Sequence, residues 1–299
     1  MGLRFWGVIN VFCLRYGPVW VDFRAIVKYF AGGLVMIGKS VRLERIIDRN
    51  SGRTVIIPMD HGVTVGPIKG LTNMRDAVSK VVAGGANAVL MHKGSPRFCH
   101  RGSGKDVGLI IHLSAGTTLS PDPNAKELAC TVEEALKLGA DGVSVHINLG
   151  ADTDKEMLKQ LGYVGERCME WQMPLLAMMY TRGPKIKNEY DVNNTKHAAR
   201  VAAELGADIV KVVYTGSSES FAEVVDGCHL PVLIAGGEKM ETDEQIVKMI
   251  EGALKAGAAG LSIGRNVFQH KDPTKIVSVF SKMVHKGLSA ADALKMLKE

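Results

Sequence analysis

The strongest constraint on the fold is a series of eight short, continuous apolar runs that alternate with segments of helical periodicity. The runs are residues 54–60, 87–93, 108–114, 141–147, 174–180, 207–213, 231–237 and 260–265. Strands that are apolar without alternation are typical of a parallel sheet covered on both faces. Eight such units predict an α/β fold with a single closed (β/α)8 barrel, the TIM barrel, rather than an open doubly wound sheet.

A repeated junction supports this division into units. The sequences GGANAVL (84–90), GADGVSV (139–145), GADIVKV (206–212) and GAAGLSI (257–263) each join a helix end to a strand. We expect a glycine in each junction to form a left-handed helix C-cap. Two extra terminal helices are also predicted, one in residues 41–52 that leads into the barrel floor and one in residues 289–299 on the outside.

The N-terminal segment differs from the rest of the chain. Eight of the 17 aromatic residues lie in the first 30 positions, and residues 1–53 account for the whole net charge of +6. We interpret residues 1–36 as an atypical leader outside the native protein, with a membrane-contacting leader as the alternative, and residues 37–299 as the catalytic barrel. Because residues 54–299 are neutral overall, the basic excess near the N-terminus indicates no nucleic-acid-binding face. Five scattered cysteines without a C-x-x-C pair favour a reducing cytoplasm.

One charged residue interrupts the sixth run. Lys211 lies in the middle of GADIVKVVYTG (206–216). In a barrel neither face of a strand meets water, so an unpaired ammonium group there is poorly hydrated and its pKa should fall. A neutral amine is the nucleophile that forms a Schiff base with a carbonyl substrate. An ion-paired or solvent-reaching lysine is the alternative, but polar residues predicted on the same rim favour the nucleophile.

Polar residues at the ends of the runs gather, in a barrel, on the rim that holds the active site. Asp60 and Tyr180 are the proton-transfer pair that Schiff-base chemistry needs, with a helix N-cap and simple packing as the alternatives. The last two runs end in Gly236-Gly237 and Gly264-Arg265. Their backbone N–H groups and the guanidinium predict a phosphate site.

Four histidines offer a rival chemistry. His61, His92, His112 and His146 lie near the ends of the first four runs, where a barrel could gather them around zinc for a metal-dependent aldolase or hydrolase. No H-x-H pair or His-rich cluster supplies a recognisable ligand set. We therefore expect hydrogen-bonding histidines and no metal.

The motifs IIPMDHGVTVGPIKGL, NAVLMHKG, AMMYTRG, GADIVKVVYTG, AGGEK and GRNVFQH resemble, in this order, those of the archaeal-type class I (Schiff-base) aldolases. The resemblance covers residues 37–299 and implies that Lys211 forms the Schiff base, Asp60 accepts protons and Tyr180 donates them. It implies no cofactor, and it implies a homo-oligomeric ring, often a decamer. It also implies substrate or phosphate contacts from His61, Gly62, Val63, Thr64, Thr181, Arg182, Gly236, Gly237, Gly264 and Arg265.

Within that family, MMYTRG, HINLG and VKVVYTG are more similar to heptulosonate-forming synthases than to fructose-bisphosphate aldolases. The resemblance implies a transaldolase-type step in aromatic amino acid biosynthesis through 3-dehydroquinate. In that step 6-deoxy-5-ketofructose 1-phosphate forms the Schiff base, a three-carbon phosphorylated fragment leaves, and L-aspartate semialdehyde accepts the remainder. A class I fructose-bisphosphate aldolase and a non-catalytic phospho-sugar-binding regulator are the alternatives.

Two residues depart from the family's pattern, in which both positions are proline. Thr181 is expected to loosen its loop, and Glu238 places a carboxylate beside the predicted phosphate site. We expect Glu238 to point away from that site or to pair with Lys239.

Overall fold

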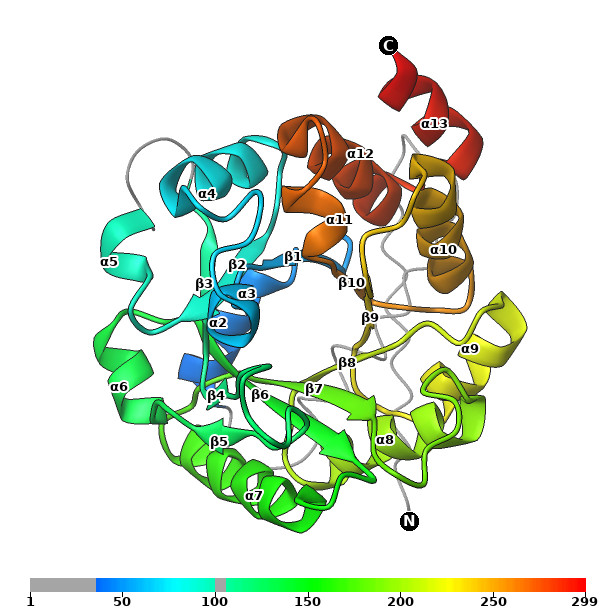
Figure 1. Cartoon of the computed structure of the whole chain (residues 1–299). Helices are drawn as coiled ribbons and strands as arrows, with labels where there is room; N and C mark the ends of the chain where they lie inside the picture. Colours follow the sequence, from blue (N-terminus) through cyan, green and yellow to red (C-terminus); the bar gives the residue numbers. More distant parts are fainter. Residues whose placement is uncertain (1–35, 100–105) are drawn as a thin grey trace, which may run out of the picture. The chain divides into compact units, whose positions relative to one another are not determined.

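Residues Met36–Glu299 form one compact unit built around a closed eight-stranded barrel. The computed structural model describes residues 36–99 and 106–299. The strands follow the order β1-β10-β9-β8-β7-β6-β3-β2 around the ring, all pairs are parallel, and helices surround them (Figure 1). The predicted TIM barrel is confirmed. The predicted leader, residues 1–36, lies outside the described residues except for Met36.

Each predicted run corresponds to one barrel strand, with ends that differ by up to three residues. The strands are β1 (Thr54–Pro58), β2 (Ala88–His92), β3 (Gly108–His112), β6 (Gly142–Leu149), β7 (Leu175–Thr181), β8 (Ile209–Val212), β9 (Val232–Ala235) and β10 (Gly260–Ser262). These runs are predictable because every strand is buried on both faces and therefore has no polar alternation.

The connections between strands hold two kinds of helix. The outer helices are α4 (Met74–Ala83), α5 (Pro96–Cys99), α6 (Val132–Lys137), α7 (Asp154–Glu170), α8 (Val192–Glu204), α9 (Ser218–Asp226), α10 (Asp243–Lys255) and α12 (Pro273–Lys286). Two short helices follow strands at the barrel mouth, α3 (His61–Val65) after β1 and α11 (Arg265–Phe268) after β10. Several outer helices begin at a side-chain cap, as in the capping box of Thr242 and Gln245 at α10.

The four repeated junctions have the predicted backbone conformation. Gly85, Gly139, Gly206 and Gly257 have φ values of 95°, 79°, 94° and 97°. Glycine reaches this left-handed region without the steric cost that a Cβ atom imposes. Each of these glycines therefore ends a helix and turns the chain into the following strand.

Strand side chains alternate between the barrel interior and the layer beneath the helices. The interior cluster consists of Ile46, Ile56, Ala88, Leu90, Ile110, Leu176, Met178, Ile209 and Leu233. Lys211 is two residues beyond Ile209 on β8, so it faces the same interior. The strand register aligns it with Met178 on β7 and Leu233 on β9. Lys211 thus lies among apolar side chains, as its sequence context predicts.

Helix α2 (Ile37–Ile46) closes the floor of the barrel through two ion pairs. Lys39 Nζ lies 2.9 Å from Asp208 Oδ2, and Arg45 Nε lies 2.5 Å from Asp141 Oδ1. The two aspartates directly precede β8 and β6. The predicted floor helix is confirmed, although it begins four residues earlier than expected, at Ile37. The predicted terminal helix is α13 (Ala290–Lys298), which packs on the outside against α10 and α12 (Figure 1).

A small antiparallel pair next to the barrel mouth was not expected from the sequence. It joins β4 (Ser114–Ala115) to β5 (Glu127–Leu128), with Ser114 opposite Leu128. The pair belongs to the connection between β3 and β6, with β4 beside β6 and β5 beside α7 (Figure 1). Among the helices of the described ranges, none combines the length and the apolar character that a bilayer crossing requires.

Candidate active site

Lys211 is buried on the inner side of β8, with 6% of its surface exposed. Within residues 36–99 and 106–299, no carboxylate oxygen lies within 4.0 Å of its Nζ. The structure therefore contradicts both alternative readings of this lysine, the ion pair and the side chain that reaches bulk solvent. A buried amine without an acidic partner is available to react with a carbonyl carbon.

Asp60 lies directly after β1 and is surrounded by basic groups. Its Oδ1 is 3.6 Å from His61 Nδ1, and its Oδ2 is 3.7 Å from His112 Nε2. Asp60 stands at the N-cap position of α3 but makes no capping hydrogen bond, so the capping alternative is wrong. Burial opposes its ionisation, but the attraction of His112, His61 and Lys211 outweighs burial and lowers the pKa of Asp60 to about 2. The side chain is therefore a carboxylate at neutral pH, as a proton acceptor must be.

Of the four predicted histidines, His112 and His146 line the barrel interior as neutral hydrogen-bonding groups, whereas His61 lies on α3 and its Nδ1 is buried without a hydrogen-bond partner among the described residues. His112 Nδ1 shares a 2.7 Å hydrogen bond with Ser144 Oγ, and its ring lies 5.2 Å from that of His92. His146 Nε2 lies 2.9 Å from Asn148 Oδ1. Burial lowers the pKa of His112 to about 4 and that of His146 to about 3. The described part of the chain holds no group of three or more His, Cys, Asp or Glu arranged to hold a metal ion.

Tyr180 on β7 lies between a histidine and an arginine. Its ring centroid is 4.8 Å from that of His146 and 4.4 Å from Arg182 Cζ. Arg182 Nε in turn donates to Glu189 Oε2 at 2.8 Å. Thr181 Oγ1 donates to the Glu189 carbonyl oxygen at 3.3 Å, and the expected loosening of this loop stays a prediction.

The ends of β9 and β10 carry the glycines that the sequence predicts to form a phosphate cradle. Gly237 has a φ of 64° with no atom within 4 Å of the position that a Cβ would take. A Cβ on Gly264 would lie 2.8 Å from the Pro58 carbonyl oxygen. The first glycine is required by its backbone angle and the second by close packing against β1. Gly237 is exposed at the mouth, where a phosphate could bind, whereas Gly264 is buried.

Asn266, which sequence reasoning did not select as a site residue, holds the cradle together. Its Nδ2 donates to the carbonyl oxygens of Gly236 at 3.0 Å and Glu238 at 2.9 Å. Its Oδ1 accepts a 2.7 Å hydrogen bond from the backbone N–H of Met240. One buried amide on α11 therefore fixes the loop that follows β9.

The Glu238 carboxylate does not fill the cradle. The residue is at the surface, with 91% of its side chain exposed, and its Oε1 lies 3.5 Å from Arg265 Nη1. Glu238 pairs with Arg265. From the sequence we expected it to point away from the site or to pair with Lys239. An exposed pair of this kind contributes only about 0–1 kcal/mol, so an incoming phosphate can replace it.

The remaining predicted contacts belong to α3. His61, Gly62, Val63 and Thr64 occupy four of its positions directly after β1. The His61 ring packs edge-on against Phe268 of α11 with centroids 5.1 Å apart. The Thr64 carbonyl oxygen accepts a 2.9 Å hydrogen bond from the N–H of Thr118. The segment thus borders the mouth between β10 and the connection that carries β4.

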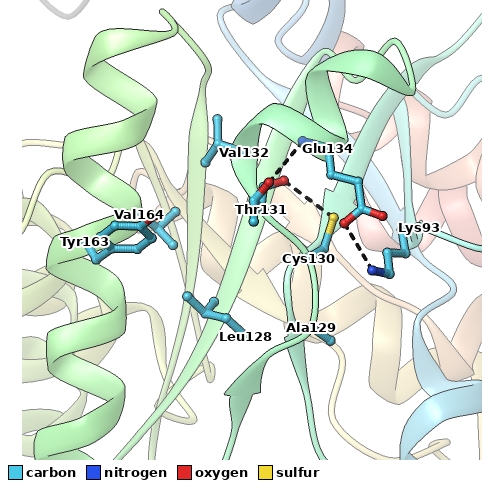
Figure 2. Close-up of a pocket in the computed structure, with 9 residues that line it drawn as sticks. All are labelled: Lys93, Leu128, Ala129, Cys130, Thr131, Val132, Glu134, Tyr163 and Val164. Atoms are coloured by element: carbon cyan, nitrogen blue, oxygen red, sulfur yellow. Dashed lines mark hydrogen bonds and ion pairs between the residues drawn. The ribbon is translucent and has the colours of Figure 1, made fainter.

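A separate hollow of about 430 Å³ lies outside this mouth, between α6, α7 and β5 (Figure 2). Its walls contain none of the predicted site residues. Lys93 Nζ and Glu134 Oε2 form a 3.0 Å ion pair in this wall. The hollow is lined by Lys93, Leu128, Ala129, Cys130, Thr131, Val132, Glu134, Tyr163 and Val164. Because the polar groups converge at the barrel mouth instead, we place the candidate active site there.

Residues 54–270 match the DeoC/LacD family of aldolases. The chain belongs to this family. It is 44% identical over 257 residues to the 2-amino-3,7-dideoxy-D-threo-hept-6-ulosonate synthase of Halobacterium salinarum, which covers 86% of this chain and 95% of the relative. It is 40% identical over 247 residues to the 2-amino-4,5-dihydroxy-6-oxo-7-(phosphonooxy)heptanoate synthase of Streptomyces griseus, which covers 83% of this chain and 90% of that protein.

Among solved structures, a Schiff-base-forming fructose-1,6-bisphosphate aldolase is 32% identical to this DeoC/LacD aldolase. The two structures superpose with a TM-score of 0.77, over 82% of this chain and 99% of that chain. The aldolase family predicted from the sequence motifs is therefore confirmed.

Proposed function

We propose that this aldolase is a 2-amino-3,7-dideoxy-D-threo-hept-6-ulosonate synthase that works through a Schiff base on Lys211. The observation that carries the proposal is the buried Lys211 amine, unpaired in the described chain and close to the ionised Asp60. The two curated relatives add support from chemistry. Both are named for products that are seven-carbon 2-amino acids with a ketone at carbon 6.

The donor in this proposal is 6-deoxy-5-ketofructose 1-phosphate. Lys211 Nζ adds to the ketone at carbon 5, and loss of water leaves an iminium ion. Asp60 accepts the proton of the carbon 3 hydroxyl while the bond between carbons 3 and 4 breaks. The electron pair of that bond forms an enamine on carbon 4. The three-carbon phosphorylated aldehyde then leaves.

The second half of the reaction uses L-aspartate semialdehyde as the acceptor. Carbon 4 of the enamine attacks the aldehyde carbon, and Tyr180 donates a proton to the new alkoxide. Water then hydrolyses the iminium ion, which releases the product and restores Lys211. The backbone N–H groups of the cradle and the Arg265 guanidinium bind the donor phosphate. The product enters the pathway to aromatic amino acids through 3-dehydroquinate.

Trapping with borohydride tests the Schiff base directly. Reduction in the presence of the donor should inactivate the enzyme and add the mass of a retained carbon fragment to the peptide that contains Lys211. Lys211→Met should form no adduct, whereas Lys155→Met, at a side chain that is 82% exposed, should react like the wild type. An adduct on another lysine, or none in the wild type, would refute the proposal.

A fructose-bisphosphate aldolase is the second candidate, and the resemblance to the Schiff-base-forming aldolase structure favours it. The two functions share the lysine and differ in the acceptor aldehyde. Turnover with L-aspartate semialdehyde and glyceraldehyde 3-phosphate as competing acceptors distinguishes them. Preference for the semialdehyde supports the synthase, and preference for the triose phosphate supports the aldolase.

We also propose that the enzyme is a ring-shaped homo-oligomer, with a decamer as the expected size, in the cytoplasm. Large apolar side chains are exposed on the barrel surface, among them Ile37, Phe98 and Met169 at 68%, 62% and 65%. Exposed apolar groups of this kind favour contacts between copies. Light scattering of the purified protein would measure the assembly, and a monomeric mass would contradict the proposal.

A further inference from the structure

A buried lysine that the proposed chemistry does not use lies next to the barrel mouth. Lys126, just before β5, has 8% of its surface exposed. Its Nζ donates a 2.7 Å hydrogen bond to the Pro123 carbonyl oxygen, and no carboxylate in the described ranges lies within 4.0 Å of it. An ammonium group has three donors, and burying it without an ion-pair partner is costly even though the Asp122 charge acts on it from beyond 4.0 Å. An anionic ligand would supply that partner.

The segment that carries Lys126 is anchored to the β6 and β7 side of the mouth. Asn148, near the end of β6, donates from Nδ2 to the Asn124 carbonyl oxygen at 2.7 Å. The register places Asn148 opposite Tyr180 on β7. A Cβ on Gly116 would lie 2.8 Å from Lys126 Nζ, so a glycine at this position leaves room for the ammonium group. The position of Lys126 is therefore built by several contacts.

Electrostatics place this charge within reach of the active site. Burial is the main cause of the lowered pKa values of His112 and His146, and the Lys126 charge lowers both further. Burial, and next the charge of Arg182, lower the pKa of Lys126 itself, and the charge of Asp122 opposes them only in part. Lys93, at the hollow of Figure 2, differs in this respect because Glu134 already neutralises it. The unsatisfied positive charge is thus at the mouth and not at the hollow.

Lys211 divides the mouth into two sides. From β8 the ring continues in one direction through β9 and β10, whose ends form the phosphate cradle. In the other direction it continues through β7 to β6, and β4 lies beside β6. Lys126 and Arg182 belong to this second side. A substrate joined to Lys211 therefore has an anion-binding group on each side.

We propose that Lys126, together with Arg182, binds the carboxylate of the incoming acceptor aldehyde, at a site separate from the phosphate cradle. The inference rests on the proposed function and adds the acceptor site to it. The departing and incoming aldehydes share the position of their reacting carbon, but one ends in a phosphate and the other in an amino acid carboxylate. Two anion sites allow each end to be bound by its own contacts. Glu189 occupies only the Nε of Arg182, which leaves further guanidinium donors for a carboxylate.

Steady-state kinetics of matched lysine variants test this assignment. Lys126→Met should raise KM for L-aspartate semialdehyde by about 10- to 100-fold, because it removes a charge-assisted hydrogen bond. KM for the donor should stay near the wild-type value. Lys126→Arg should recover most of the loss because it restores the charge. Lys155→Met, at an exposed position on α7, should leave both constants unchanged.

Three acceptors separate a charge-recognition site from a general disturbance of the mouth. They are L-aspartate semialdehyde, glyceraldehyde 3-phosphate and the neutral aldehyde butanal. A rise in KM for the semialdehyde in Lys126→Met, with or without a rise for the triose phosphate, supports the site if butanal is unaffected. An equal rise for butanal or for the donor, or a wild-type KM for the semialdehyde, overturns it.

The same experiment distinguishes this inference from the proposed function. If the wild-type enzyme does not consume L-aspartate semialdehyde, the proposed function fails and the inference fails with it. If the wild type consumes it and Lys126→Met does so equally well, the inference alone fails. The borohydride adduct on Lys211 shows that a variant retains its donor site. Where Lys126→Met forms no adduct, Lys126→Gln is judged by the same criteria.

Discussion

Replacing Asn266 tests whether the loop after β9 positions the donor phosphate or merely completes the fold. Asn266 is 5% exposed and makes three hydrogen bonds, two from Nδ2 to carbonyl oxygens and one from a backbone N–H to Oδ1. Asn266→Ala leaves all three of these backbone groups without their partner. Asn266→Asp keeps the shape but places a carboxylate oxygen against the carbonyl oxygens of Gly236 and Glu238.

The magnitude follows from the number of lost bonds. A hydrogen bond contributes about 1 kcal/mol net, so Asn266→Ala should lower the free energy of unfolding by about 3 kcal/mol. In a domain of this size each kcal/mol shifts Tm by roughly 2–4 °C, which gives a fall of roughly 6–12 °C. Asn266→Asp should cost at least as much because it replaces attraction by repulsion. If the loop positions the phosphate, KM for the donor should also rise, by about fivefold for each hydrogen bond's worth of binding lost.

Thermal unfolding and steady-state kinetics measure the two effects separately. KM for the acceptor should stay unchanged, and Asn193→Ala, at an exposed position of α8, should alter neither Tm nor KM. A lower Tm with a wild-type KM for the donor would show that Asn266 only stabilises the fold. An unchanged Tm would contradict the hydrogen bonds themselves.

Three further predictions concern the catalytic lysine, the histidines and the floor. Lys211→Met should abolish turnover because the nucleophile is removed, while Tm stays near the wild-type value because Met fills a similar apolar volume; retained turnover would refute the mechanism. Because burial lowers the pKa values of His112 and His146 from 6.5 to about 4 and about 3, the unfolded chain binds protons below pH 6.5 that the folded chain does not. The free energy of unfolding should therefore fall as the pH falls from 6.5 towards 4, and His146→Gln should flatten that slope in urea titrations. Lys39→Met should lower the free energy of unfolding by about 3–5 kcal/mol because it leaves buried Asp208 unpaired. The double variant Lys39→Met/Asp208→Asn should recover part of that loss, measured as a rise in the urea midpoint.

The barrel and its catalytic lysine are predictable because their signals are local in the sequence. A strand buried on both faces shows itself as a short apolar run, and Lys211 stands out only because Ile, Val and Val surround it. The polar residues at strand ends, such as Asp60 and Tyr180, are predictable once the barrel is assumed, because all strand ends meet at one rim.

The residues that the sequence did not indicate depend on contacts between distant positions. Asn266 forms hydrogen bonds with backbone groups 26 to 30 residues away, and the residues next to it in the sequence do not indicate these bonds. Lys126 is buried because of β4 and β5, strands of two residues each that are too short to show any periodicity. The hydrogen bond from the Thr181 hydroxyl to the Glu189 carbonyl oxygen is likewise not revealed by any pattern in the sequence.

The ion pairs of α2 carry a consequence for how the ring closes during folding. Lys39 and Asp208 are 169 residues apart in the chain, and Arg45 and Asp141 are 96 apart. Contacts of such separation form late because the chain between them must first be ordered. During synthesis on a ribosome, α2 is made first, but Lys39 can form its ion pair only after Asp208, just before β8, has been synthesised. Protection of the α2 amides from hydrogen exchange thus reports closure of the eight-stranded barrel and not the formation of α2 alone.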